Sequence, residues 1–203
     1  MWNRRAHYYL GLYLLLFVWL FCFTGLLLNH PEWRFADFWP TRKQSTIDRS
    51  IRRPPAGSGV QQARDILSQL GLQGEIEWTV ERENLSRFEF RASRPGHIYE
   101  IKTDLDLGRA TVQRIDVNAW GVMRILHTFS GVRAGDARNE RDWTLTSIWV
   151  FAMDAVAAGL IVMLLGSYCM WWRLPRKRLW GLVALLSGWI TCVVFVMGFR
   201  LFP

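Results

Sequence analysis

The stretch that decides the fold is residues 8–29, YYLGLYLLLFVWLFCFTGLLLN, which contains no charged residue. A helix rises about 1.5 Å per residue, so this stretch is long enough to cross an apolar bilayer core about 30 Å thick. It is longer than the core of a signal peptide, and no small-x-small cleavage site follows it. We therefore predict a retained transmembrane helix over residues 8–29.

Two further apolar blocks, residues 147–172 and 180–200, are long enough to span a bilayer. The first of them contains a single charged residue, Asp154. Tryptophan and tyrosine gather near the edges of all three blocks, which is typical of residues at a membrane interface. The sequence therefore predicts a membrane protein with three transmembrane helices.

The basic residues of the short segments predict the orientation. Residues 1–7 carry Arg4 and Arg5, and the loop 173–179, RLPRKRL, carries four basic residues and no acidic one. Short loops rich in arginine and lysine stay in the cytoplasm. We expect these two segments to be cytoplasmic, and residues 30–146 and 201–203 to lie on the other side.

The overall charge has a simple explanation in this topology. The chain has 25 Lys and Arg against 17 Asp and Glu, a net charge of +8. Such a balance can indicate nucleic-acid binding, but part of it sets the topology here, and we expect no nucleic-acid partner. The three cysteines lie within the predicted spans, and no CxxC motif, catalytic triad, phosphate loop or HExxH motif is present.

The segment between the first two spans consists of three stretches with different residue patterns. Residues 30–56 are rich in proline and charge and predict a linker. Residues 57–116 begin with an amphipathic helical pattern and continue with four alternating runs, the first of which places Ile76 and Trp78 on one side. These predict an α+β domain whose helix covers one face of an antiparallel sheet. Residues 117–146 predict an interfacial helix and a loop.

This arrangement resembles the PepSY-associated transmembrane family. The motifs that carry the resemblance are RAHYYLG at 5–11, TGLLLNHP at 24–31, LHTFSG at 126–131, DAVAAGL at 154–160 and MWWR at 170–173. The resemblance implies a bacterial inner-membrane protein with an inserted, periplasmic PepSY-like domain at residues 57–116.

The same resemblance implies a link to iron. Larger relatives include ferrisiderophore reductases, which hold haem with histidines on their membrane helices. PepSY domains elsewhere act on metallopeptidases as inhibitors or chaperones. This chain differs from the reductases in having three spans, four histidines and no cytoplasmic cofactor domain.

The histidines are the candidate cofactor ligands. His7 and His30 lie at opposite ends of the first span, 23 residues and so roughly 34 Å apart. His30 and His127 are both expected near the outer surface, where an imidazole pair could bind haem b. Alternatively, His30 caps the helix that ends before Pro31.

The other two histidines are weaker candidates for ligation. His7 could hold haem only with a ligand from a second chain, or with Met170 or Cys169. His97 follows a Pro-Gly turn and is expected to be exposed.

Asp154 is the most informative single residue, because a carboxylate within a span costs several kcal/mol unless it is paired, hydrated or protonated. One interpretation is structural, with hydrogen bonds from Thr24, Asn29 or His30. The other is that Asp154 orients a histidine ligand. Both place it among the candidate site residues.

Three functions compete, and of these we predict the first. The first is a haem-binding redox or accessory component of iron or siderophore uptake, which would make the chain a reductase-like oxidoreductase component. The second is a periplasmic binding or regulatory module without catalysis, acting on a peptidase or membrane partner. The third is a transporter built around Asp154, for which three spans form a poor pathway. The expected partners are membrane lipid and either another protein or further copies of this chain; no metal ion is expected.

Overall fold

The computed structural model describes residues 2–81, 87–133 and 140–201. Three helices are long and apolar enough to cross a membrane: α1 (Trp2–Asn29), α4 (Thr144–Trp172) and α5 (Arg178–Leu201). They include the three predicted spans. Residue 1 of the predicted N-terminal segment and residues 202 and 203 of the C-terminal one lie outside the described residues. The chain divides into two compact units, Phe17–Asp154 and Met1–Leu16 with Ala155–Pro203.

In the second of these units, small residues bring α1 and α4 together. A Cβ on Gly159 would lie 3.0 Å from Leu14, which is itself only 1% exposed. Nearer the start of α1, the Asn3 amide donates to the Gly166 carbonyl over 3.1 Å. Close approach over small residues is how membrane helices gain packing energy. By contrast, none of the most apolar stretch of α5 is buried.

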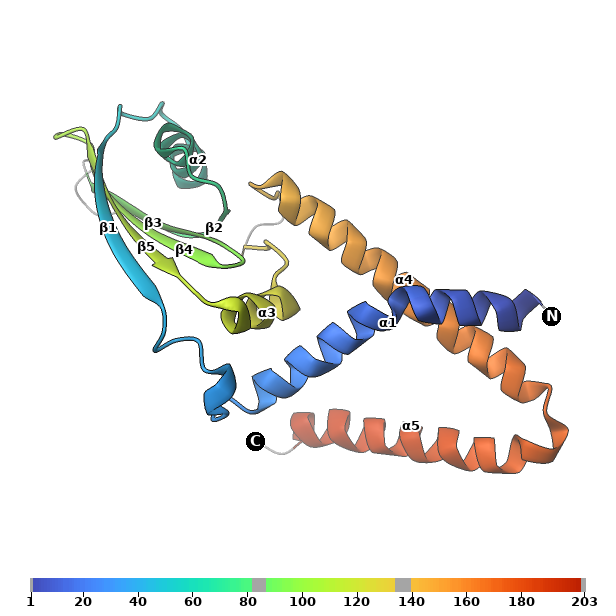
Figure 1. Cartoon of the computed structure of the whole chain (residues 1–203). Helices are drawn as coiled ribbons and strands as arrows, with labels where there is room; N and C mark the ends of the chain where they lie inside the picture. The colour runs from blue at the N-terminus through green and yellow to red at the C-terminus, as the bar shows by residue number, and fades with distance from the viewer. Residues whose placement is uncertain (1, 82–86, 134–139, 202–203) are drawn as a thin grey trace. The chain divides into compact units, whose positions relative to one another are not determined.

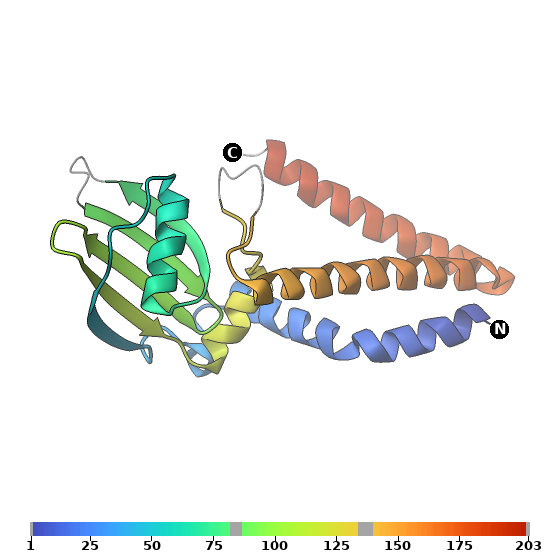
Figure 2. The same cartoon turned by 90° about the horizontal axis from the view of Figure 1, so that it is seen from above.

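The first unit contains a five-stranded antiparallel sheet in the order β1-β5-β4-β3-β2 (Figure 1). The strands have these bounds: β1 Lys43–Ser50, β2 Glu75–Glu81, β3 Arg87–Arg94, β4 His97–Asp104 and β5 Arg109–Asp116. Figure 2 shows helix α2 (Gly59–Leu70) lying across one face of this sheet. The predicted α+β arrangement is therefore confirmed.

Local sequence explains why α2 begins and ends where it does. Ser58 and Gln61 form a capping box, each side chain bonding to the other residue's backbone N–H. Gly71 ends the helix in the left-handed conformation, with φ of 67°, that residues with a Cβ disfavour. The buried face of α2 packs on the sheet and completes the hydrophobic core. The buried residues of this core are Ile51, Ala63, Ile66, Leu67, Ile76, Phe88, Phe90, Ala92, Tyr99, Ile101, Ala110 and Val112.

Strand β1 differs from the prediction, because residues 43–50 were expected to be linker. The strand pairs with β5 along its whole length, from Lys43 opposite Asp116 to Ser50 opposite Arg109. All eight of its residues are exposed. An edge strand exposed on both faces needs no alternation of apolar and polar residues, so the periodicity that identified the other strands is missing here.

A β-bulge in β2 also changes the expected side-chain pattern. Ile76 pairs with Ala92 and Trp78 with Arg91, so two steps along β2 match one step along β3. Ala92 faces α2, and its neighbour Arg91 faces the other side. Ile76 is accordingly fully buried whereas Trp78 is 41% exposed. The prediction that these two side chains share a face is wrong.

Helix α3 (Ala119–Thr128) approaches the sheet at the turn between β3 and β4. Asn118 caps its first turn by accepting from the Gly121 N–H. Ile98 is buried but alternates with Tyr99, so it faces away from the α2 core. Val122 of α3 lies 3.4 Å from where a Cβ on Gly96 would stand, at the turn before β4.

The bulged register predicts that substitutions at Ile76 and Trp78 lower the free energy of unfolding by different amounts. Ile76→Ala should lower the free energy of unfolding by about 2–5 kcal/mol, because it opens a cavity in the core. Trp78→Ala should cost about 1 kcal/mol or less, because the indole is half exposed. Pulse proteolysis of the full chain in detergent, across a urea series, measures both. Equal losses for the two variants would contradict the bulged register.

Candidate functional site

The predicted ligand His127 lies on α3 and packs against the C-terminal half of α1. Its Nδ1 shares a hydrogen bond of 2.7 Å with the Thr24 hydroxyl, and Thr24 is almost fully buried. The ring also lies beside Phe21, with centroids 5.2 Å apart. Gly25 provides the room, because a Cβ there would be 3.6 Å from the imidazole Cε1. The histidine is thus held by one face of α1.

Arg124, one turn earlier on α3, caps the end of α1. Its guanidinium donates to the Leu27 carbonyl and, over 3.4 Å, to the His30 carbonyl. The last carbonyls of a helix lack partners within the helix and carry partial negative charge. Arg124 also lies 5.8 Å from the centre of the Phe38 ring. Arg124 and His127 together therefore fasten α3 to α1.

His30 lies in different surroundings. Its Nδ1 is 3.0 Å from the Glu32 carboxylate, and its ring stacks on Trp33 with centroids 4.5 Å apart. A backbone hydrogen bond and then the bond from His30 hold the pKa of Glu32 below its ordinary value. His30 is therefore engaged in an exposed pair at the end of α1.

These contacts do not form an axial pair for haem. The His127 ring lies against Gly25, and His30 follows five residues later, roughly 140° around the helix and about 7.5 Å along it. The two rings have different partners on different sides of α1. The residues as they stand do not fit one iron between His30 and His127, and haem binding by them stays a prediction.

The other two candidate site residues, His7 and Asp154, lie on α1 and α4. The His7 Nδ1 is enclosed without a hydrogen-bond partner among the described residues. Asp154 is exposed on α4, and within the part of the chain that the structure describes no hydrogen bond or ion pair reaches it. Thr24, which we expected as one of its donors, bonds instead to the Leu20 carbonyl and to His127.

His97 is more engaged than its turn position predicts. Its Nδ1 lies 2.5 Å from the Asp116 carboxylate, which also accepts from Arg114 over 2.7 Å. Burial would raise the pKa of Asp116, but the hydrogen bonds from Arg114 and His97 outweigh burial and lower it. The same bond from Arg114 raises the pKa of that guanidinium. This cluster joins the ends of β4 and β5.

A buried charge network, which the sequence did not reveal, attaches the start of α4 to the sheet. The Glu75 carboxylate, 3% exposed, accepts from the backbone N–H of Asp142 and Trp143 over 2.8 and 3.1 Å. In return, the Asp142 carboxylate accepts from the backbone N–H of Ile76. β2 and the segment before α4 thus exchange three hydrogen bonds to carboxylates, which are stronger than neutral ones.

Two arginines neutralise Asp142, whose side chain is only 4% exposed. Arg133 is 2.8 Å from one carboxylate oxygen and Arg64 of α2 is 2.5 Å from the other. The bond to Asp142 is the main reason that the pKa of Arg64 is raised. Gly131 makes the close packing possible, because its φ is 66° and a Cβ there would lie 2.6 Å from Thr146. Asp142 therefore joins α2, β2 and the start of α4.

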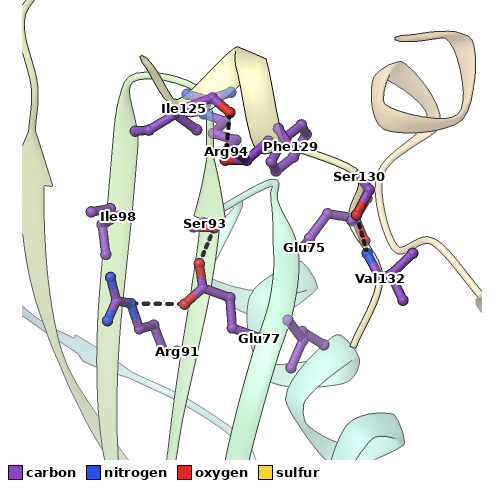
Figure 3. A pocket seen from close by; sticks show the side chains of 13 residues that line it. Glu75, Glu77, Arg91, Ser93, Arg94, Ile98, Ile125, Phe129, Ser130 and Val132 are labelled. Atoms are coloured by element: carbon purple, nitrogen blue, oxygen red, sulfur yellow. Dashed lines mark hydrogen bonds and ion pairs between the residues drawn. The ribbon is translucent and has the colours of Figure 1, made fainter. Parts of the chain in front are cut away.

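Beside this network the domain has a cavity of about 360 Å³. Figure 3 shows its polar side, where Glu77 lies between Arg91 and Ser93. The cavity is lined by residues of β2, β3 and β4 and by the segment from the end of α3 to Val132. A site with apolar walls and a few polar groups is the usual form of a small-ligand or peptide site.

Sequence reasoning missed both the network and the cavity. Glu75 alternates with Ile76 in the first of the alternating runs, a pattern that predicts an exposed side chain, and Asp142 lies in a segment predicted as loop. No group of three or more metal-ligating side chains occurs among the described residues.

No family model, no curated protein and no solved structure matches this chain.

The network predicts that the Asp142 carboxylate contributes far more to the stability of the domain than the neighbouring Glu140 carboxylate does. Asp142→Asn should lower the free energy of unfolding by about 3–5 kcal/mol, because it removes the buried carboxylate with which both Arg133 and Arg64 pair. Glu140 pairs with the same Arg64 but is 51% exposed, so Glu140→Gln should cost about 1 kcal/mol or less. Pulse proteolysis of both full-length variants in urea checks this. A loss for Asp142→Asn no larger than for Glu140→Gln would contradict the network.

Proposed function

We propose that this chain is a membrane-anchored binding module of the PepSY-associated type, whose α+β domain recognises a protein partner. The observation that carries the proposal is the mixed polar and apolar cavity of the domain, at the side where α3 and the start of α4 are fastened. A partner held there would act next to the membrane. This function needs no cofactor and no catalytic residue.

The proposal includes a location. The three helices are long and apolar enough to span, and the basic segments 1–7 and 173–179 favour a cytoplasmic N-terminus. The domain would then lie on the periplasmic side of a bacterial inner membrane. In this orientation, Arg124 and His127 hold α3 at the outer end of α1.

Asp154 supports a further contact within the membrane. Its carboxylate is exposed on an apolar helix, and a membrane acid is stable only when it is paired, hydrated or protonated. α5, none of whose most apolar stretch is buried, offers a second free surface. Both features favour a membrane subunit or a second copy of this chain as neighbour.

One observation favours the alternative of a haem-binding redox or accessory component in iron uptake. Thr24 occupies Nδ1 of His127, and metal-binding histidines commonly have one ring nitrogen held in this way while the other binds. The second ligand would have to come from elsewhere than His30. The binding module requires no such ligand and is the better supported function.

An absorption spectrum separates the two functions. We expect no low-spin haem band in the purified full chain, oxidised or dithionite-reduced, even when haem is supplied during expression. A band that His127→Ala abolishes and His97→Ala leaves intact would contradict this expectation and establish the redox component.

Crosslinking tests the module directly. A photoreactive amino acid at Val132, at the cavity and 51% exposed, should capture one protein in intact cells. The same amino acid at Leu107, 70% exposed in the turn between β4 and β5, should not. The captured protein, once purified, should bind the full chain, and Ser130→Trp should weaken that binding at least tenfold by filling the cavity.

Equal capture from both positions, or binding that Ser130→Trp leaves unchanged, would contradict a partner site at the cavity.

A further inference from the structure

The charged side chains of the cavity wall differ in whether they already have a hydrogen-bond or ion-pair partner. Glu77 pairs with Arg91 over 3.0 Å and also accepts from the Ser93 hydroxyl. Glu75 is occupied by the two backbone N–H groups of the charge network. Both acidic side chains of the cavity wall therefore already have partners, and so does one of its two arginines.

Arg94 is the remaining charge. Its Nε is buried without a hydrogen-bond partner, and its guanidinium lies 5.7 Å from the centre of the Trp143 ring. Within residues 2–81, 87–133 and 140–201, no ion pair reaches it. A buried donor that lacks a partner costs about 1–3 kcal/mol, and more where the group is charged. Nε itself is closed to the cavity, but an anionic ligand there would pair with the rest of the guanidinium and neutralise its charge.

The rest of the wall is apolar. Ile98 of β4 and Ile125 and Phe129 of the α3 segment line the cavity beside Arg94; Figure 3 shows Arg94 next to Ile125 and Phe129. A volume of about 360 Å³ is near the lower end for ligand sites, so it fits a small molecule or the end of a chain. The ligand chemistry that matches is a carboxylate attached to an apolar group.

We propose that the cavity binds the C-terminal carboxylate of a polypeptide that ends in an apolar residue, with Arg94 as the anchor. Arginine binds carboxylates through paired, charge-assisted hydrogen bonds. The apolar side chains that line the cavity beside Arg94 would contact the apolar terminal residue of that polypeptide. This assignment rests on the proposed binding function and names the chemical class that its site takes.

The test compares three probes on the full chain in lipid nanodiscs by calorimetry. They are acetyl-alanyl-alanyl-leucine with a free carboxylate, the same peptide with a C-terminal amide, and hexanoate. We expect the free acid to bind at least tenfold more tightly than either other probe. Arg94→Gln should weaken binding of the free acid at least tenfold, whereas Arg87→Gln, an exposed arginine on the same strand, should leave it unchanged.

Several results would overturn the assignment. Equal affinity for acid and amide, absence of acid binding at millimolar concentration, or an Arg94→Gln variant that binds normally would each exclude an Arg94–carboxylate contact. Hexanoate binding as tightly as the peptide acid would assign the cavity to small amphiphiles. The acid-amide comparison uses the unaltered chain, so it holds even if Arg94→Gln fails to fold. Capture at Val132 without acid binding would retain the binding function and remove only this ligand class.

Discussion

The carboxylate of Asp142 is the point on which the domain depends. It is almost fully buried and bonds to Arg133, to Arg64 of α2 and to the backbone of Ile76 at the start of β2. Buried charges are tolerated only when every partner is in place, because desolvation costs several kcal/mol per ion. The segment before α4 therefore has one position relative to the sheet, and Glu75 reinforces it through the backbone of the same segment.

A second attachment lies at α1. Arg124 caps the carbonyls at the end of that helix and His127 bonds to Thr24 within it, so α3 is fixed by two side chains one turn apart. The cavity lies next to both attachments, since the end of α3 and residues 130–132 form part of its wall. A ligand there would contact the same segments that connect the domain to its helices. This arrangement is the physical basis of the proposed binding module.

The sequence predicted what depends on one-dimensional patterns. Apolar runs identified the three long helices, period 3.6 identified α2, and alternation identified β2 to β5. β1 was missed because an exposed edge strand has no alternation, and the bulge that turns Trp78 outward leaves no mark in the pattern. The burial of Glu75 and Asp142 could not be predicted either, because the sequence gives no sign that acidic residues 67 positions apart will meet.

The residues of the candidate site, too, were predictable from the sequence only in part. Composition identified His127 and Asp154 as unusual for their positions, yet not the Thr24 hydroxyl that holds His127. His30 was placed correctly at the end of α1, but its partners Glu32 and Trp33 are set by the local turn. Arg94 is one arginine among many in the sequence, and only its place in the cavity wall distinguishes it.

Hydrogen–deuterium exchange of the full chain in detergent, read at single amides, tests the central attachment most directly. The account predicts that the amides of Ile76, Asp142 and Trp143 exchange as slowly as those in the middle of β3 and β4, because each donates to a buried carboxylate. Exchange of these three amides as fast as that of an exposed turn would show that the charge network does not hold the start of α4 to the sheet, and would contradict the account.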